Sequence, residues 1–268
     1  MSASIAVAAT APFGADVLER LAATHEVTSV ITRPDAPAGR GRRLAPSAAK
    51  LVAQRLGLPV LEPERLESGL ELDAPVVVAV AYGLIVPEAV LGERLWLNVH
   101  PSLLPRWRGA APVERALMAG DPETGVSIIE LVKELDAGPI AAQESFAVRA
   151  DDDAGAVFAR AAEVAAELLR RVLADPGATR HDQVGEPSYA AKITAQDRRL
   201  DLDRPARGLV DHVRALSPHI GARAHLHGRG VTIWKARVAE DGGFEPVEVQ
   251  PDGGRPMTYD AWLRGLRP

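Results

Sequence analysis

The alternation of strand and helix patterns near the start of the chain constrains its fold more than any other feature. Residues 4–9 form a short apolar run typical of a buried strand, and residues 14–23 place apolar side chains at helical spacing. A second strand pattern follows at residues 27–32. A strand, a helix and a strand within about thirty residues predict a right-handed βαβ unit, and therefore a parallel sheet.

A later segment indicates that helices cover both faces of this sheet. Residues 75–81 read PVVVAVA, a near-continuous apolar run typical of a strand that is buried on both sides. The chain is therefore expected to belong to the α/β class, with an open, mostly parallel twisted sheet. The first strand-to-helix turn, residues 9–14, lacks the G-x-G-x-x-G pattern, so a nicotinamide-dependent dehydrogenase is not supported.

The composition excludes several kinds of site. The 268 residues contain no cysteine, which rules out disulfides, thiolate metal sites and a cysteine nucleophile. The formal net charge of −5 gives no global attraction to nucleic acid, so any contact with RNA requires a local basic patch. The N-terminus has no basic region before an apolar run, and no apolar run approaches the roughly 20 residues that span a bilayer. We therefore expect a cytoplasmic protein with no membrane partner.

Residues 97–112, LNVHPSLLPRWRGAAP, carry the most specific chemical pattern. In an extended strand Asn98 and His100 point to the same face, with Val99 turned toward the core, and Pro101 ends the strand. An amide can stabilise the oxyanion of a tetrahedral intermediate, and an imidazole can move protons near neutral pH, so the pair suits acyl-group chemistry. The same pair is also common in an ordinary hydrogen-bonded turn, and by itself it leaves both interpretations open.

A second segment, residues 33–43, reads RPDAPAGRGRR and is the clearest basic patch in the chain. Its prolines and glycines predict an exposed loop without regular structure. Charge alone allows either a solvated loop or a contact with a nucleic-acid backbone, because guanidinium groups match phosphates.

The pattern Asn-x-His-x-Ser-Leu-Leu-Pro at residues 98–105 resembles the signature of the folate-dependent formyltransferases. The continuation at residues 106–112 and the Pro-Ala-Gly-Arg-Gly core of the basic loop are similar to the members that act on methionyl-tRNA. The resemblance implies a Rossmann-like formyltransferase domain followed by a β-barrel. Residues 239–247 are shorter than in the family, so we expect a small, reduced barrel. The expected division is residues 1–188 for the catalytic domain, 189–202 for a linker and 203–268 for the small C-terminal domain.

The resemblance also assigns roles to particular residues. Asp136 lies in a Leu-Asp-x-Gly segment, which alone would be an ordinary turn. By resemblance it joins Asn98 and His100 as a catalytic residue. The residues expected to contact the folate are Tyr82, Gly83, Leu84, Ile85, Ser102, Leu103, Leu104 and Pro105. Those expected to contact tRNA are Arg33, Arg40, Arg42 and Arg43.

The function implied is transfer of a formyl group from 10-formyltetrahydrofolate to the α-amine of initiator methionyl-tRNA, by a monomer and without a metal. Three alternatives stay open: a formyltransferase acting on a nucleotide-linked amino sugar, a non-catalytic folate- or RNA-binding homologue, and a hydrolase that releases formate. Asp151, Asp152 and Asp153 are interpreted as helix-capping acids rather than a cation site. His225 and His227 are assigned to a β-hairpin rather than to a metal.

Overall fold

A computed structural model describes residues 4–38 and 43–266 of the chain. The chain forms two compact units, which are described separately. Unit 1 comprises residues 1–108, 125–145 and 159–188. Unit 2 comprises residues 109–124, 146–158 and 189–268.

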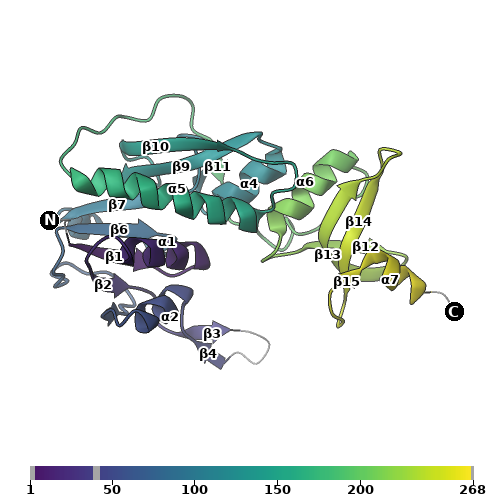
Figure 1. Cartoon of the computed structure of the whole chain (residues 1–268), viewed down its shortest axis with the longest axis horizontal. Helices are drawn as coiled ribbons and strands as arrows, with labels where there is room; N and C mark the ends of the chain where they lie inside the picture. Colours follow the sequence, from purple (N-terminus) through teal and green to yellow (C-terminus); the bar gives the residue numbers. More distant parts are fainter. Residues whose placement is uncertain (1–3, 39–42, 267–268) are drawn as a thin grey trace. The chain divides into compact units, whose positions relative to one another are not determined.

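Unit 1 is built on a seven-stranded sheet (Figure 1). Its strands, from one edge to the other, are β10 (Ile140–Ala147), β9 (Glu123–Glu130), β7 (Leu95–His100), β6 (Val76–Val80), β1 (Ile5–Ala9), β2 (Val27–Ile31) and β5 (Val60–Leu61). The pairs from β7 to β5 are parallel, whereas β9 runs antiparallel to β7. The predicted mostly parallel sheet is therefore confirmed, and β10 is an additional strand that was not predicted.

The N-terminal βαβ unit forms as predicted, with helix α1 (Pro12–Ala22) between β1 and β2. Pro12 begins the helix, where its missing N–H costs nothing. A Cβ on Gly14 would overlap the carbonyl oxygen of Val80, so only glycine lets this helix start so close to the end of β6. The helix then buries Val17, Leu18 and Leu21.

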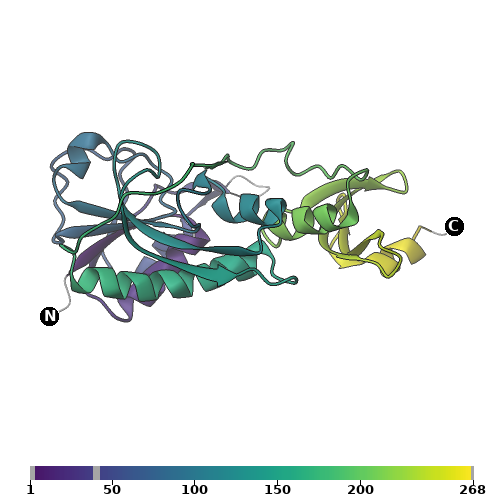
Figure 2. The ribbon, with the colours of Figure 1, turned by 90° about the horizontal axis from the view of Figure 1, so that it is seen from above.

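Apolar side chains are buried on both faces of the sheet. All five residues of β6 are buried, as the PVVVAVA run predicts. Val77 and Ala79 belong to a cluster with Trp96 and with Val90 of the short helix α3 (Glu88–Leu91). Helices α1 and α5 (Ala154–Ala174) lie on one face and α3 on the other (Figure 2). The expectation of helices on both faces is confirmed.

The basic segment corrects one prediction, because part of it has regular structure. β3 (Ala36–Ala38) and β4 (Arg43–Ala45) form an antiparallel two-stranded sheet, in which Pro37 lies opposite Leu44. In a two-stranded sheet each strand has an unpaired edge, where a proline removes no ladder hydrogen bond, so a single proline does not prevent pairing. We call these six residues the β3–β4 ribbon. It is followed by helix α2 (Ala48–Arg55).

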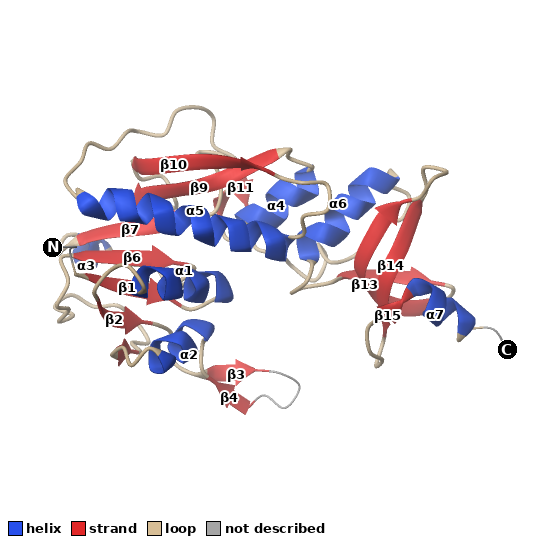
Figure 3. Cartoon of the chain, in the orientation of Figure 1, coloured by secondary structure: helices blue, strands red, loops and turns tan. Residues whose placement is uncertain are grey.

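Unit 2 contains a four-stranded antiparallel sheet and three helices among its described residues (Figure 3). Its strands are β12 (Ala222–Leu226), β13 (Arg229–Val238), β14 (Phe244–Pro251) and β15 (Met257–Thr258). Its helices are α4 (Pro112–Ala119), α6 (Ala206–Leu216) and α7 (Tyr259–Arg264). A further two-stranded sheet joins β8 (Arg108–Gly109) and β11 (Tyr189–Ala190). The predicted small C-terminal β domain is therefore present as an antiparallel sheet.

The predicted hairpin in unit 2 turns at two residues with left-handed backbone. His227 has φ +50° and Gly228 has φ +72°, as a tight turn between twisted strands requires. Behind the sheet, Val213 and Leu216 of α6 pack with Ile233 and with Trp262 of α7. This cluster is a separate core, distinct from that of unit 1.

No helix within residues 4–38 and 43–266 is long and apolar enough to cross a membrane.

Candidate active site

Asn98, His100 and Asp136 lie together in unit 1. Strand β7 carries Asn98 and His100 on one face, while Val99 is buried on the other. Asp136 comes from the connection between β9 and β10. The Asn98 Nδ2 lies 3.5 Å from Asp136 Oδ1, and the His100 Nδ1 lies 3.7 Å from Asp136 Oδ2. The carboxylate is therefore within reach of both the amide and the imidazole.

The environment of His100 defines which ring nitrogen holds a proton. Its Nε2 lies 2.8 Å from the carbonyl oxygen of Trp107, and a carbonyl only accepts hydrogen bonds, so Nε2 donates. The other nitrogen, Nδ1, faces the carboxyl of Asp136. The two side chains are only 5% and 10% exposed, and two facing lone pairs would repel each other there. His100 Nδ1 and the Asp136 carboxyl therefore face each other as an acid–base pair, and either group can take up or release a proton during a reaction.

The backbone around Asp136 is held in an unusual conformation. Asp136 has φ +48°, in the left-handed region. Two residues later, a Cβ on Gly138 would overlap the carbonyl oxygen of Glu130, so the turn needs glycine there. The side chain of Gln183 donates to the carbonyl oxygens of Asp136 (2.8 Å) and Gly138 (2.9 Å). Sequence reasoning missed Gln183, because it lies in a loop without a recognisable pattern.

Side chains of strands β9 and β10 hydrogen-bond to the backbone of the Ser102–Pro105 loop. The Ser127 Oγ accepts from the backbone N–H of Leu104 (3.1 Å) and donates to the carbonyl of Ser102 (2.7 Å). Gln143 Nε2 donates to this same Ser127 oxygen (2.8 Å) and to the Leu104 carbonyl (3.0 Å). Ser127 and Gln143 were not predicted, although Ser127 is a polar residue inside an apolar strand pattern, which is a usable signal.

The side chains of this loop differ in exposure. Ser102 is fully buried and its Oγ donates to the carbonyl of Arg106 (2.7 Å). Leu104 is also buried, whereas Leu103 and Pro105 are partly exposed. Only the last two side chains are open to a ligand without rearrangement.

The Tyr82–Ile85 segment follows strand β6. Tyr82 is buried, which raises the pKa of its hydroxyl to about 12. Its carbonyl accepts from Thr10 Oγ1 (2.8 Å), which joins the ends of β1 and β6. Gly83 has φ +80°, Leu84 is partly buried and Ile85 is 90% exposed. The segment therefore presents one large apolar side chain, Ile85, to its surroundings.

Two of the four predicted tRNA-binding arginines are described. Arg33 follows strand β2 and is exposed, and Arg43 is an exposed residue of the β3–β4 ribbon. Arg40 and Arg42 lie outside the described residues.

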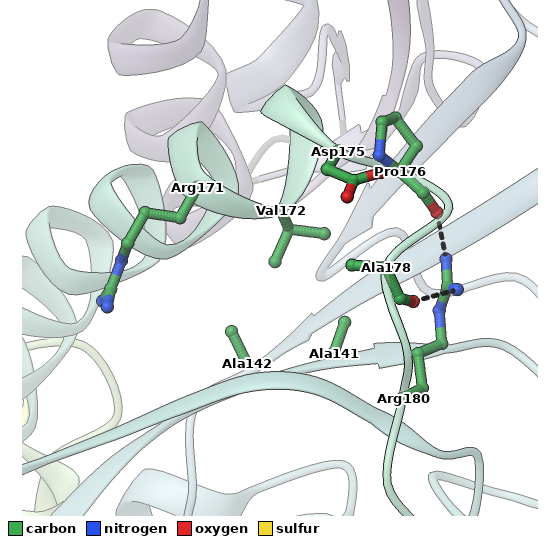
Figure 4. Close-up of a pocket in the computed structure, with 8 residues that line it drawn as sticks. All are labelled: Ala141, Ala142, Arg171, Val172, Asp175, Pro176, Ala178 and Arg180. Atoms are coloured by element: carbon green, nitrogen blue, oxygen red, sulfur yellow. Dashed lines mark hydrogen bonds between the residues drawn. The ribbon is translucent and has the colours of Figure 1, made fainter.

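A cavity of about 250 Å³ lies elsewhere in unit 1 and contains none of the predicted site residues (Figure 4). Arg180 at its wall donates to the carbonyls of Pro176 and Ala178 and pairs with Glu130. Arg171, which also lines the cavity, pairs with Glu144, and Asp175 is the acidic residue of the lining. Among the described residues, no three His, Asp or Glu side chains are grouped to hold a metal ion.

Comparison with known proteins shows the family of the chain. The model of the formyl transferase family matches residues 3–173, and the model of the formyl transferase C-terminal domain matches residues 192–246. A methionyl-tRNA formyltransferase from Paracoccus denitrificans is 39% identical over 284 residues, covering 96% of this chain and 95% of that protein.

Two solved structures share the fold. A methionyl-tRNA formyltransferase from Clostridium thermocellum has a TM-score of 0.66 at 14% identity, covering 93% of this chain and 98% of that chain. HypX from Aquifex aeolicus, solved in complex with tetrahydrofolic acid, has a TM-score of 0.69 at 17% identity, covering 97% of this chain and 46% of that chain.

An amide, an imidazole and a carboxyl gathered at the end of a parallel strand are the groups that acyl transfer requires, and the sequence relatives place this α/β chain among the enzymes that transfer acyl groups. With the family match over more than half of its length, the chain belongs to the formyl transferase family.

Proposed function

We propose that this enzyme transfers the formyl group of 10-formyltetrahydrofolate to the α-amine of initiator methionyl-tRNA. The observation that supports the chemistry is the position of the Asp136 carboxyl, which lies 3.5 Å from the Asn98 amide and 3.7 Å from the His100 imidazole. The acceptor is supported by a methionyl-tRNA formyltransferase 39% identical over nearly the whole chain. The product would supply translation initiation in the cytoplasm, and we expect the enzyme to act as a monomer.

In the proposed mechanism the amine attacks the formyl carbon and a tetrahedral oxyanion forms. The Nδ2 group of Asn98 donates to that oxygen, while the His100–Asp136 pair accepts the proton that the amine loses. A free α-amine has a pKa near 7.7–8.0, so an appreciable neutral fraction exists at pH 7 and a weak base is sufficient. The proton then passes to the departing nitrogen of the folate as the carbon–nitrogen bond breaks.

The folate contacts are assigned by exposure. Leu103, Pro105 and Ile85 would pack against the flat rings of the cofactor, because these apolar side chains are accessible. Ser102 and Leu104 would act indirectly, since they hold the loop from inside. The tetrahydrofolic acid bound to HypX supports a folate as the donor in this fold.

The contact with tRNA is assigned to Arg33, Arg40, Arg42 and Arg43. The exposed positions of Arg33 and Arg43 support this assignment, because phosphate contacts require accessible guanidinium groups.

One assay tests the proposal. Purified protein is mixed with 10-formyltetrahydrofolate and either charged initiator tRNA or an amino-sugar nucleotide, and formylated product is measured. We expect formyl-methionine on the tRNA and no turnover of the sugar. Turnover of the sugar alone, or release of formate without any acceptor, would overturn the proposed acceptor.

A further inference from the structure

We propose that Gln183 is a positioning residue that fixes Asp136 against His100 during formyl transfer. The inference rests on the proposed function and extends it to a residue outside the predicted site. Gln183 lies in the segment that follows helix α5, far along the chain from Asn98 and His100. It touches neither the formyl group nor the amine in this assignment.

The amide of Gln183 uses both its donor and its acceptor sides. Its Nε2 donates to the carbonyls of Asp136 (2.8 Å) and Gly138 (2.9 Å). Its Oε1 accepts from the Nε (3.1 Å) and Nη2 (2.6 Å) of Arg108. Glutamate has no donor for the two carbonyls, and methionine has neither function. A neutral amide is therefore the group that satisfies all four contacts.

These bonds close a ring around the imidazole. His100 Nε2 donates to the carbonyl of Trp107, and the next residue, Arg108, donates to Gln183. Gln183 in turn holds the backbone of Asp136, whose carboxyl faces His100 Nδ1. The segments that contact the two ring nitrogens of His100 are thus both hydrogen-bonded to the side-chain amide of Gln183. Movement of either side would change the distance between His100 Nδ1 and the Asp136 carboxyl.

Asp136 needs such support because its own conformation is unfavourable. Its left-handed backbone (φ +48°) is uncommon for a residue with a side chain, and its neighbour Leu135 is 65% exposed. The apolar core therefore contributes little to holding this turn. The two hydrogen bonds from Gln183 therefore stabilise the position of the turn that carries Asp136.

The test compares Gln183→Met and Gln183→Glu with wild type in formylation of methionyl-tRNA. We expect kcat to fall at least tenfold in both variants, with the KM for folate and for tRNA within twofold of wild type. Gln54→Met, an exposed glutamine on helix α2, is the matched control and should leave kcat unchanged. Circular dichroism checks that each variant is folded.

The pH profile separates positioning from a general loss of structure. The protonation of two ionisable side chains that face each other depends on the distance between them. When Asp136 drifts from His100, we therefore expect the acid limb of the kcat profile to shift, which a mere loss of folded protein would not cause. Arg108→Met should reproduce part of this shift, and the double variant should be less than additive.

An unchanged kcat and acid limb in both Gln183 variants, with an active wild type, would overturn the inference. If the wild type formylates no tRNA, the proposed acceptor fails instead. The inference is then tested by NMR titration of the His100 ring, which requires no activity. A His100 titration identical in wild type and Gln183→Met would overturn it in that case as well.

Discussion

At the scale of single residues, the side chains of the candidate site are positioned by contacts with one another and with the backbone. His100 has both ring nitrogens committed, one to the Trp107 carbonyl and one toward Asp136. Asn98 is oriented by Asp136 at 3.5 Å, which leaves its second amide hydrogen for the oxyanion.

Replacing Asn98 by alanine removes the proposed oxyanion donor. We expect kcat to fall by about 10²–10³, with KM little changed, because the lost interaction strengthens in the transition state. A loss smaller than threefold would contradict the role. Asn98 is the only asparagine in the chain, so labelling with ¹⁵N-asparagine isolates its side-chain signal. That signal should shift when formylfolate binds.

Replacing Gly138 by alanine tests the turn that carries Asp136. The new Cβ would overlap the Glu130 carbonyl oxygen, so the turn must move and carry Asp136 with it. We expect activity to fall more than tenfold, measured as kcat/KM. Gly177→Ala is the control, since the nearest atom to its Cβ is 3.7 Å away and its activity should hold. Equal activity of the two variants would show that the turn tolerates displacement.

At the scale of elements, a lysine links the segment just before the β3–β4 ribbon to the edge of the sheet. Lys50 of helix α2 donates to Asp35 (2.7 Å), just before β3, and to Glu62 (2.9 Å), just after β5. These hydrogen bonds, that to Asp35 first, raise the pKa of Lys50. The lysine therefore joins the base of the ribbon to the edge of the sheet.

Lys50→Met should release the ribbon without affecting the chemistry. We expect the KM for methionyl-tRNA to rise several-fold while the KM for folate stays constant, because only the RNA contact depends on the position of the ribbon. Steady-state kinetics at fixed salt measure both values. Lys133→Met removes an exposed pair with Glu88 and should change neither. A rise in both KM values would instead indicate a general disturbance of unit 1.

At the scale of the whole molecule, stability should depend on pH through the buried His212 and the partly buried His25. Burial lowers the pKa of His212, whose Nε2 bonds the Asp197 carbonyl (2.6 Å), and it also lowers the pKa of His25. The unfolded chain therefore binds more protons than the folded one below the ordinary histidine pKa of about 6.5. Stability is full above that value and declines as the pH falls through it.

Urea unfolding at pH 7.5 and pH 5.5 measures this effect. We expect the wild type to be less stable at pH 5.5, and His212→Gln to reduce the difference, because glutamine still donates to the carbonyl but does not titrate. His219→Gln, at an exposed position, should leave the difference unchanged. A wild type equally stable at both pH values would contradict the assignment.

The features that could be predicted from the amino-acid sequence alone are local. The βαβ unit, the strand PVVVAVA buried on both faces and the shared face of Asn98 and His100 follow from periodicities of two to four residues, which neighbouring side chains impose. The hairpin at His227 and Gly228 follows from turn chemistry in the same way. The antiparallel pairing of the β3–β4 ribbon was wrongly excluded, because one proline does not break an edge.

Which residues distant in the chain contact each other depends on the three-dimensional packing. Asp136 was expected at the site by resemblance alone, and its approach to Asn98 spans 38 residues of chain. Gln183 reaches the same turn across 47 residues, and Ser127 supports the Leu104 loop across 23. Such contacts depend on how strands β7, β9 and β10 align side by side, which no local pattern encodes. The packing of the sheet therefore determines these side-chain partners, and the periodicity of the sequence does not predict them.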